Sequence, residues 1–203
     1  MSAQKILRMD SNEIKKLIYS KKNWARCCKD EQNSIEQSTE VWPNSSLSME
    51  LFKKFYREYE YKITILYNTV TLFKNVNINE KHVIEWKERK YDIGFVSTSL
   101  SRTVKNYDLF HKIAESDKLK EYSPVSVGDN SKITKSDKIT YFPLLQPNEL
   151  FEVLGNTKII ICTSYFDASP NVLVESKCHG CEIILSKNVG GYQEYKYICE
   201  DVY

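Results

Sequence analysis

The stretch SYFDASPNVLVESKCHGCEIILS (residues 164–186) predicts a short helix followed by a buried strand. Pro170 stands at the expected first helical position, which favours proline because its missing N–H is not needed there. Gly180 follows the last expected helical residue, the usual place for a glycine stop. The run CEIILS (181–186) is almost wholly apolar, as in a strand covered on both faces. The stretch therefore predicts one helix–strand unit of an α/β fold.

The same alternation extends from residue 92 to the end of the chain. Helices are expected over about 105–117 and from Pro147 to just before Gly155. Strands separated by helices favour a Rossmann-like parallel sheet with helices on both faces. The further predicted strands are DIGFVS (92–97), YSPVSVG (122–128), KITYF (138–142), KIIICTS (158–164) and KYICE (196–200).

The first 90 residues have a different character from the rest. All three tryptophans lie before residue 90, whereas all six glycines lie after residue 93. We expect two parts: a mostly helical segment with a linker (1–90) and a Rossmann-like domain (91–203).

Local patterns predict four elements in the N-terminal segment. The aromatic face of its second helix is interpreted as core, or alternatively as an interaction surface. In order, the elements are a helix beginning at Asp10-x-x-Glu13 with Ile14, Leu17 and Ile18 on one face, a helix capped by Ser48 with Phe52, Phe55, Tyr56 and Tyr59 on one face, a strand KITILYN (62–68), and a polar linker or hairpin (71–90).

Composition narrows the function classes. The formal net charge is only +2, which gives no electrostatic footprint for nucleic acid. No apolar run is long enough for a transmembrane helix, and the N-terminus lacks the apolar core of a secretory signal, so we expect a soluble, cytoplasmic protein. Six irregularly spaced cysteines do not suggest a disulfide framework. Richness in Lys, Asn, Ile and Tyr is typical of an A+T-rich genome, such as that of a large DNA virus or a bacterium.

Four loops are expected beyond the carboxyl ends of the strands, where such sheets bind ligands. Cationic side chains and close-approaching glycine backbones are suited to phosphate oxygens, as are the free N–H groups of a helix start. The candidate residues on these loops are Arg102 and Lys105, Gly128, Asp167, and Gly190, Gly191 and Glu194.

Asp167 and Glu175 need a different role, because carboxylates repel phosphate. Carboxylates instead accept hydrogen bonds from neighbouring hydroxyl groups. A ligand with both phosphates and sugar rings would use both kinds of group, so the pattern indicates a nucleotide-diphosphate sugar.

The segment FDASPNVLVESKCHGCEIILSKNVGGYQE (166–194) resembles the donor-site signature of the group 1 (family 4) retaining glycosyltransferases, which have the GT-B fold. That signature is acid-x7-acid, a glycine, an apolar strand and Gly-Gly-x-x-Glu; Asp167-x7-Glu175 fits it, with Asp in place of the usual Glu. GFVSTSLSRTVKN (94–106), VSVGDN (125–130) and ITYFPLLQPNELFEVLGNTKIIICTS (139–164) resemble the family's preceding segments, and residues 44–70 faintly resemble its interdomain stretch.

The resemblance implies a role for each matching position. Arg102 and Lys105 would hold the donor diphosphate and stabilise the leaving group. Glu175 would accept hydrogen bonds from the ribose, and Asp167 would face the transferred sugar. Backbone contacts are implied for the base at Tyr141 and Phe142, for sugar and phosphate at Ser169, Pro170, Asn171 and Val172, and for the glycine turns at Gly128, Gly190 and Gly191. The family needs no metal, so only a UDP- or GDP-sugar donor is expected.

The resemblance covers a donor-binding half. It implies that residues 91–203 are a nucleotide-sugar-binding domain and that residues 1–90 are a remnant of, or a link to, an acceptor domain. An acceptor domain would need roughly 150 residues before position 44. A fragment, a partner chain or self-association is therefore expected to account for the other half, and the acceptor, whether glycan, lipid or protein, is not specified.

Plainer interpretations stand beside these. Arg102 and Lys105 could form an exposed basic loop, with Lys112 or Lys132 as the phosphate ligands, and Gly190-Gly191 could be a simple turn. Cys178-x-x-Cys181 lacks a matching second pair, so both are expected to be small buried thiols. Structural roles are expected for His111 and His179, and His82 falls in the linker.

Three functions remain open. They are a retaining glycosyltransferase, a nucleotide-sugar-binding module that is inactive without an acceptor half, and a degenerate interaction protein that keeps only the fold.

Overall fold

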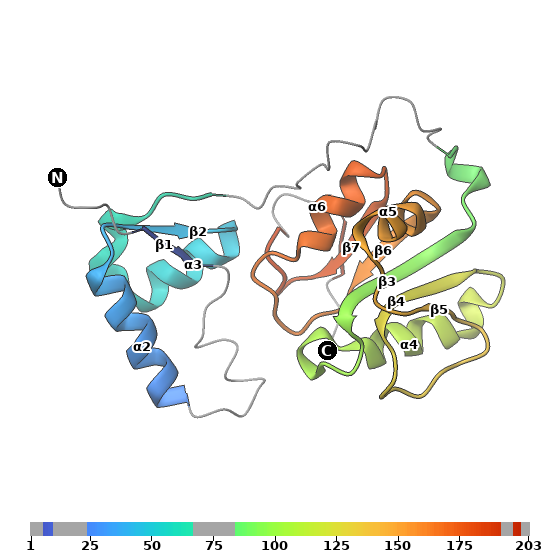
Figure 1. The fold of residues 1–203 in the computed structure, drawn as a ribbon, viewed down its shortest axis with the longest axis horizontal. Coiled ribbons are helices and arrows are strands. Elements are labelled where there is room, and N and C mark those ends of the chain that lie inside the picture. Colours follow the sequence, from blue (N-terminus) through green and yellow to red (C-terminus); the bar gives the residue numbers. More distant parts are fainter. Residues whose placement is uncertain (1–5, 10–23, 67–83, 192–196, 200–203) are drawn as a thin grey trace.

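The computed structural model describes residues 6–9, 24–66, 84–191 and 197–199 (Figure 1). The predicted helix that begins at Asp10, the residue His82 and the residue Glu194 lie outside these ranges.

The larger part of the chain is built on a six-stranded sheet in which every strand pairs in parallel. The strand order is β5-β4-β3-β6-β7-β8. The chain therefore enters the sheet at its middle with β3, adds β4 and β5 on one side, and then crosses to the other side of β3 to form β6, β7 and β8. All six predicted strands are present, with ends shifted by one or two residues. Their bounds are β3 Tyr91–Ser99, β4 Pro124–Asp129, β5 Thr140–Phe142, β6 Thr157–Cys162, β7 Glu182–Ser186 and β8 Tyr197–Cys199.

Three helices cover the sheet, and they confirm helices on both faces. α5 (Pro147–Gly155) and α6 (Asn171–Cys178) lie on one face and α4 (Tyr107–Glu115) lies on the other (Figure 1). Pro147 is the first residue of α5, as expected, and the N–H of Gln146 is held by the Glu149 carboxylate at 2.9 Å.

One crossover departs from the usual pattern. Residues 130–139 join parallel strands β4 and β5 without a helix, although such connections normally contain one. This loop packs Ile133 and Ile139 against the aromatic core that α4 makes with β3. That core contains Phe95, Tyr107 and Phe110, whose ring centroids lie 5.3–6.0 Å apart.

The N-terminal part is a small layered unit of its own. α2 (Trp24–Gln37) and α3 (Ser46–Phe55) accompany a parallel pair, β1 (Ile6–Met9) and β2 (Glu40–Pro43). Its core consists of Ile35, Val41, Phe52 and Tyr56. The Lys62 ammonium group donates to the carbonyls of Ile35, Glu36 and Ser38 at 2.8–3.1 Å, which satisfies the C-terminal end of α2.

Several predictions in this part were wrong in detail. Helix α3 is capped by Ser45, whose hydroxyl accepts the Ser48 N–H at 3.1 Å, so Ser48 lies inside the helix. The helix ends at Phe55, and Tyr59 lies in a following 3-10 turn (Arg57–Lys62) that covers the start of the predicted strand 62–68. After that turn the backbone does run beside β2: Ile63 bridges Val41, and the Leu66 N–H donates to the Pro43 carbonyl at 2.9 Å.

Candidate functional site

The loops after β3 and β6 meet in an ion pair between Lys105 and Asp167. Both side chains are mostly covered, at 20% and 17% exposed. Partial burial strengthens their attraction relative to a surface pair, because less water screens it. The structure thus brings together one residue predicted to contact phosphate and one predicted to contact sugar.

Backbone contacts between the two loops fix this pairing. The short 3-10 turn Thr103–Lys105 follows β3, and its Val104 carbonyl accepts the Tyr165 N–H at 2.9 Å. Asn106 then adopts a left-handed conformation with φ +52° and forms two hydrogen bonds with Thr163, the residue that follows β6. Its amide donates to the Thr163 carbonyl at 3.2 Å, and the Thr163 hydroxyl donates to the Asn106 carbonyl at 2.8 Å. Both residues are buried, so this double contact holds Lys105 near Asp167.

The glycine turn after β7 packs against the loop that follows β6 and carries Asp167 (residues 163–169, the acidic loop). The Gly190 N–H donates to the Asp167 carbonyl at 2.6 Å, and the Asp167 N–H donates to the Asn188 carbonyl at 3.3 Å. A Cβ atom at Gly190 would lie only 1.5 Å from the Ala168 carbonyl oxygen. A glycine is therefore required here for two backbones to approach, and Gly190 belongs to the same cluster as Lys105 and Asp167. Gly191 follows with φ +92°, which also favours glycine.

Arg102 lies at the same edge of the sheet and is exposed. It occupies the cap position just before the turn that carries Lys105. Its guanidinium group forms no hydrogen bond or ion pair within the described ranges. It is therefore available to a ligand with anionic oxygens.

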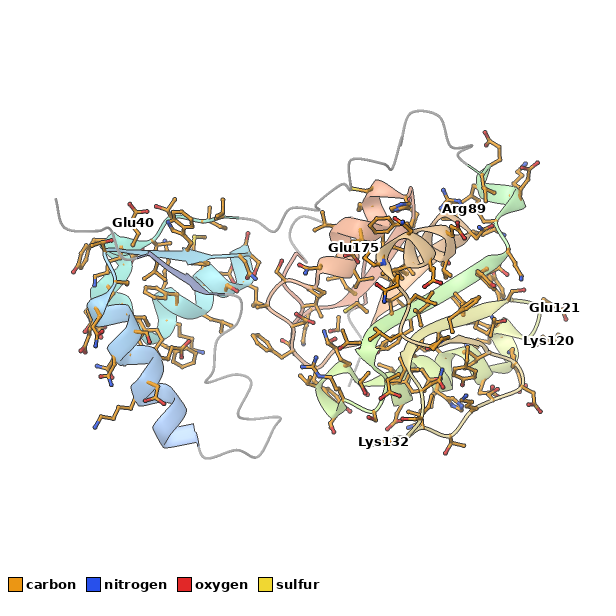
Figure 2. All side chains as sticks on the ribbon, in the orientation of Figure 1. Glu40, Arg89, Lys120, Glu121, Lys132 and Glu175 are labelled. Atoms are coloured by element: carbon orange, nitrogen blue, oxygen red, sulfur yellow. The ribbon has the colours of Figure 1, made fainter. Side chains whose placement is uncertain are left out.

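Glu175 lies in the second turn of α6 (Figure 2) and is half-buried. Burial raises the pKa of its carboxyl group, and no nearby cation counters that effect. Its carboxylate has no hydrogen-bond or ion-pair partner among the residues that the structure describes. A partly desolvated acid without a partner is typical of a functional position. Arg102 and Glu175 form no ion pair with each other.

The turn that follows α6 is held by Arg89, a residue that the sequence analysis did not identify and that is labelled in Figure 2. Its guanidinium donates to the carbonyls of Thr157 at 2.8 Å, Gly180 at 3.0 Å and His179 at 3.1 Å. His179 and Gly180 directly follow α6 and Thr157 begins β6, so Arg89 ties the turn after the helix that carries Glu175 to the start of β6.

The remaining predicted positions are placed as follows. The Tyr141 hydroxyl lies 2.8 Å from the Tyr107 hydroxyl, and the Phe142 carbonyl accepts from the Asn130 amide at 3.3 Å. Gly128 has φ +142° and packs against the Ser97 carbonyl, so its role in the structure is close strand approach. Ser169, Pro170, Asn171 and Val172 form the entry to α6. The prediction that Pro170 is the first helical residue was wrong by one position, because Pro170 has extended backbone and is the cap residue, and Asn171 begins the helix.

A cavity of about 310 Å³ lies on the α4 face of the sheet, beneath the helix-free crossover. It contains Lys132, the predicted alternative phosphate ligand, whereas Arg102, Lys105, Asp167 and Glu175 are not among its lining residues. Its lining is Leu100, Ser101, Tyr107, Asp108, His111, Lys132, Ile133 and Thr134.

The cysteine prediction was half right. Cys181 is a buried thiol that donates to the Leu154 carbonyl at 3.2 Å, and burial raises its pKa to about 11. Cys178 is exposed, because it lies on the outer side of the last turn of α6. His179 caps that helix and stacks on Phe151, with ring centroids 4.7 Å apart.

The described residues contain neither a metal-binding cluster nor a membrane-spanning helix. No group of three or more His, Cys, Asp or Glu side chains is arranged to hold a metal ion there. None of the helices in those ranges combines the length and apolarity needed to cross a bilayer.

Comparison with known proteins identifies fold relatives only among solved structures. No family model matches the chain, and no curated protein matches it. The chain is similar to sucrose-phosphate synthase from Thermosynechococcus elongatus, with TM-score 0.66, 14% identity, 93% of this chain covered and 51% of the other. It is also similar to HepE from Anabaena in complex with UDP and glucose, with TM-score 0.68, 12% identity and coverage of 97% and 58%. A mutant of TarM from S. aureus, in a complex that includes UDP, gives TM-score 0.69, 16% identity and coverage of 98% and 42%.

These likenesses establish the fold class. The expected Rossmann-like α/β domain of the GT-B type, preceded by a mostly helical segment, is confirmed. The chain spans about half the length of the solved structures it matches.

Proposed function

We propose that this chain binds a nucleotide-diphosphate sugar and supplies the donor-binding half of a retaining glycosyltransferase that transfers a hexosyl group. The observation that carries the proposal is the convergence of Lys105, Asp167 and Gly190 at the carboxyl edge of the sheet, beside the exposed Arg102.

The charges of this cluster suit a diphosphate. Arg102 has no hydrogen-bond or ion-pair partner among the described residues, and Lys105 forms an ion pair with Asp167. A diphosphate at this edge would gain both cations, and arginine can bind two phosphate oxygens with parallel hydrogen bonds. The same groups would stabilise the charge that develops on the departing nucleoside diphosphate.

The acids suit the hydroxyl-bearing parts of the donor. Asp167 lies beside Lys105 and would face the transferred sugar, while Glu175 would accept hydrogen bonds from the ribose. Burial removes water from the Glu175 carboxylate and so raises its pKa. Hydroxyl groups of the ribose would replace the hydrogen bonds that this water made. Backbone groups at Tyr141, Phe142, Ser169, Pro170, Asn171, Val172, Gly128, Gly190 and Gly191 are proposed to complete the contacts to base, phosphate and sugar.

UDP is the proposed nucleotide. HepE was solved with UDP and glucose and also with UDP-glucose, and the TarM mutant was solved with UDP. The chain spans about half of these structures, and we propose that the acceptor half comes from a further part of the same protein, from another chain or from a second copy.

A binding module without transfer activity is the second candidate. The cluster at the carboxyl edge of the sheet supports this candidate as well, since a donor site alone can hold a nucleotide sugar without delivering the sugar to an acceptor.

A thermal-shift and calorimetry panel of UDP-glucose, GDP-mannose and ADP-glucose tests the proposal. At a ligand concentration of 100 Kd, binding adds about 2.7 kcal/mol, a rise in Tm of roughly 5–10 °C for a chain of this size. No shift and no heat with any donor would refute donor binding. Release of free sugar or UDP by the binding-competent chain would separate the enzyme from the binding module.

A further inference from the structure

The N-terminal end of α3 contacts the acidic loop directly. The Ser45 hydroxyl donates to the Ala168 carbonyl at 2.5 Å and accepts the Ser48 N–H at 3.1 Å. Ser45 is 2% exposed, so water does not compete for these bonds. One side chain therefore caps α3 and also holds the residue that follows Asp167.

An apolar contact accompanies this hydrogen bond. Leu51 of α3 packs with Phe166 and Ala168 of the acidic loop, and this cluster also includes Leu47 and Val104. Phe166 precedes Asp167 in the chain, and Val104 precedes Lys105. Helix α3 thus touches the neighbours of both members of the ion pair.

The turn at Gly190 packs against the same two residues, Ser45 and Ala168. A Cβ atom at Gly190 would lie 2.6 Å from the Ser45 hydroxyl oxygen as well as 1.5 Å from the Ala168 carbonyl. The start of α3, the acidic loop and the turn after β7 are therefore packed without space between them.

We infer that α3 is a brace for the donor site and that Ser45 is its positioning residue. By holding the Ala168 carbonyl while Leu47 and Leu51 cover Phe166 and Val104, the brace keeps Asp167 within reach of Lys105. The N-terminal part is on this view required for the site, although it supplies no group to the ligand. The consequence for ligand affinity rests on the proposed function; the consequence for the loop does not.

Backbone amide exchange over residues 163–169 tests the brace without any ligand. Ser45→Gly removes the bond to Ala168 but leaves α3 nearly as well capped, because glycine is a tolerated cap residue. We expect exchange in this loop to quicken about three- to tenfold, the range of one buried hydrogen bond, while α3 keeps its protection. Leu47→Ala shortens a partly buried side chain of the same cluster, and it should also quicken amide exchange in this loop.

Ser34→Ala is the matched control. Ser34 is exposed on α2, and its hydroxyl bonds only to the Asp30 carbonyl of the same helix. Its variant should leave exchange over 163–169 unchanged. Equal exchange in wild type, Ser45→Gly and Leu47→Ala would overturn the brace.

A titration with UDP-glucose then tests the link to the site. We expect Kd to rise about three- to tenfold in Ser45→Gly and to stay within twofold in Ser34→Ala. A quicker loop with unchanged Kd would overturn the positioning role. If wild type binds no nucleotide sugar, the proposed function fails, while the exchange measurements still decide whether the brace exists.

Discussion

Lys105 and Asp167 are 62 residues apart in the chain and form an ion pair at the carboxyl edge of the sheet. Asp167 is therefore an internal counter-ion for Lys105 in the candidate site. An incoming phosphate must compete with the Asp167 carboxylate for the Lys105 ammonium group.

Removing that competition should strengthen binding of the bare nucleotide. In Asp167→Asn, Lys105 loses its internal anion and the phosphate loses a repelling neighbour. We expect UDP to bind about three- to tenfold more tightly, and the preference for UDP-glucose over UDP to shrink. Calorimetric titrations of both ligands measure this. Asp137→Asn, at an exposed site before β5, should behave as wild type. Weaker UDP binding in Asp167→Asn would show that Asp167 positions Lys105 more than it competes.

Loss of the unpaired cation should weaken binding of every nucleotide sugar. Arg102→Ala removes a guanidinium group that no described residue uses, so stability should hardly change. Kd for UDP should rise roughly 10- to 100-fold, the range for hydrogen bonds to a charged group. Arg57→Ala, in an exposed arginine of the N-terminal part, is the matched control. Unchanged UDP affinity in Arg102→Ala would exclude Arg102 from the phosphate site.

The Glu175 carboxyl group should lower the free energy of unfolding by an amount that depends on pH. Its folded-state pKa is raised by burial, so the carboxylate destabilises the fold at pH values above that pKa. Below the unfolded value of about 4.3 the group is protonated in both states and the cost vanishes. We expect Glu175→Gln to raise Tm by a few degrees at pH 7, and this gain to disappear near pH 4.

Two measurements complete the case for Glu175. The same variant should bind UDP about tenfold more weakly, because an amide is a poorer acceptor for ribose hydroxyls. Glu152→Gln, at an exposed position of α5, should change neither Tm nor affinity. A Tm gain equal at both pH values would contradict the burial account.

Substitutions at Gly190 and Gly155 compare a glycine that allows two backbones to approach closely with one that does not. Gly190→Ala forces a Cβ atom against the Ala168 carbonyl, and we expect a loss of about 1–3 kcal/mol, a fall in Tm of roughly 3–10 °C. Around Gly155, at the end of α5, a Cβ atom meets nothing within 4 Å, so Gly155→Ala should be neutral or stabilising by up to about 1 kcal/mol. Thermal unfolding of the two variants checks this; equal Tm values would show that the turn after β7 can shift.

The alternation of strands and helices was predictable because its signals are local. Pro147 and Gly180 mark helix ends through their own backbone chemistry, and the apolar runs of β6 and β7 are long enough to identify. Ser45 was missed in favour of Ser48 because both serines stand near the start of the same apolar pattern. Only the packing of Ser45 on Ala168 distinguishes them.

The site itself was less accessible from the sequence. The residue types Lys105, Asp167 and Gly190 could be selected, but their pairing depends on Asn106 and Thr163, which lie 57 residues apart and carry no motif. The sequence predicted no helix between the strands 122–128 and 138–142, and the crossover of residues 130–139 contains none.

The strand order has a consequence for synthesis on the ribosome. β3 emerges with β4 as its first neighbour, and its other edge stays open until Thr157–Cys162 has been made. An open edge of nine residues in a growing chain can recruit strands from other chains. A polypeptide that stalls before β6 should therefore aggregate rather than fold, whereas one released after β7 already has β3 enclosed.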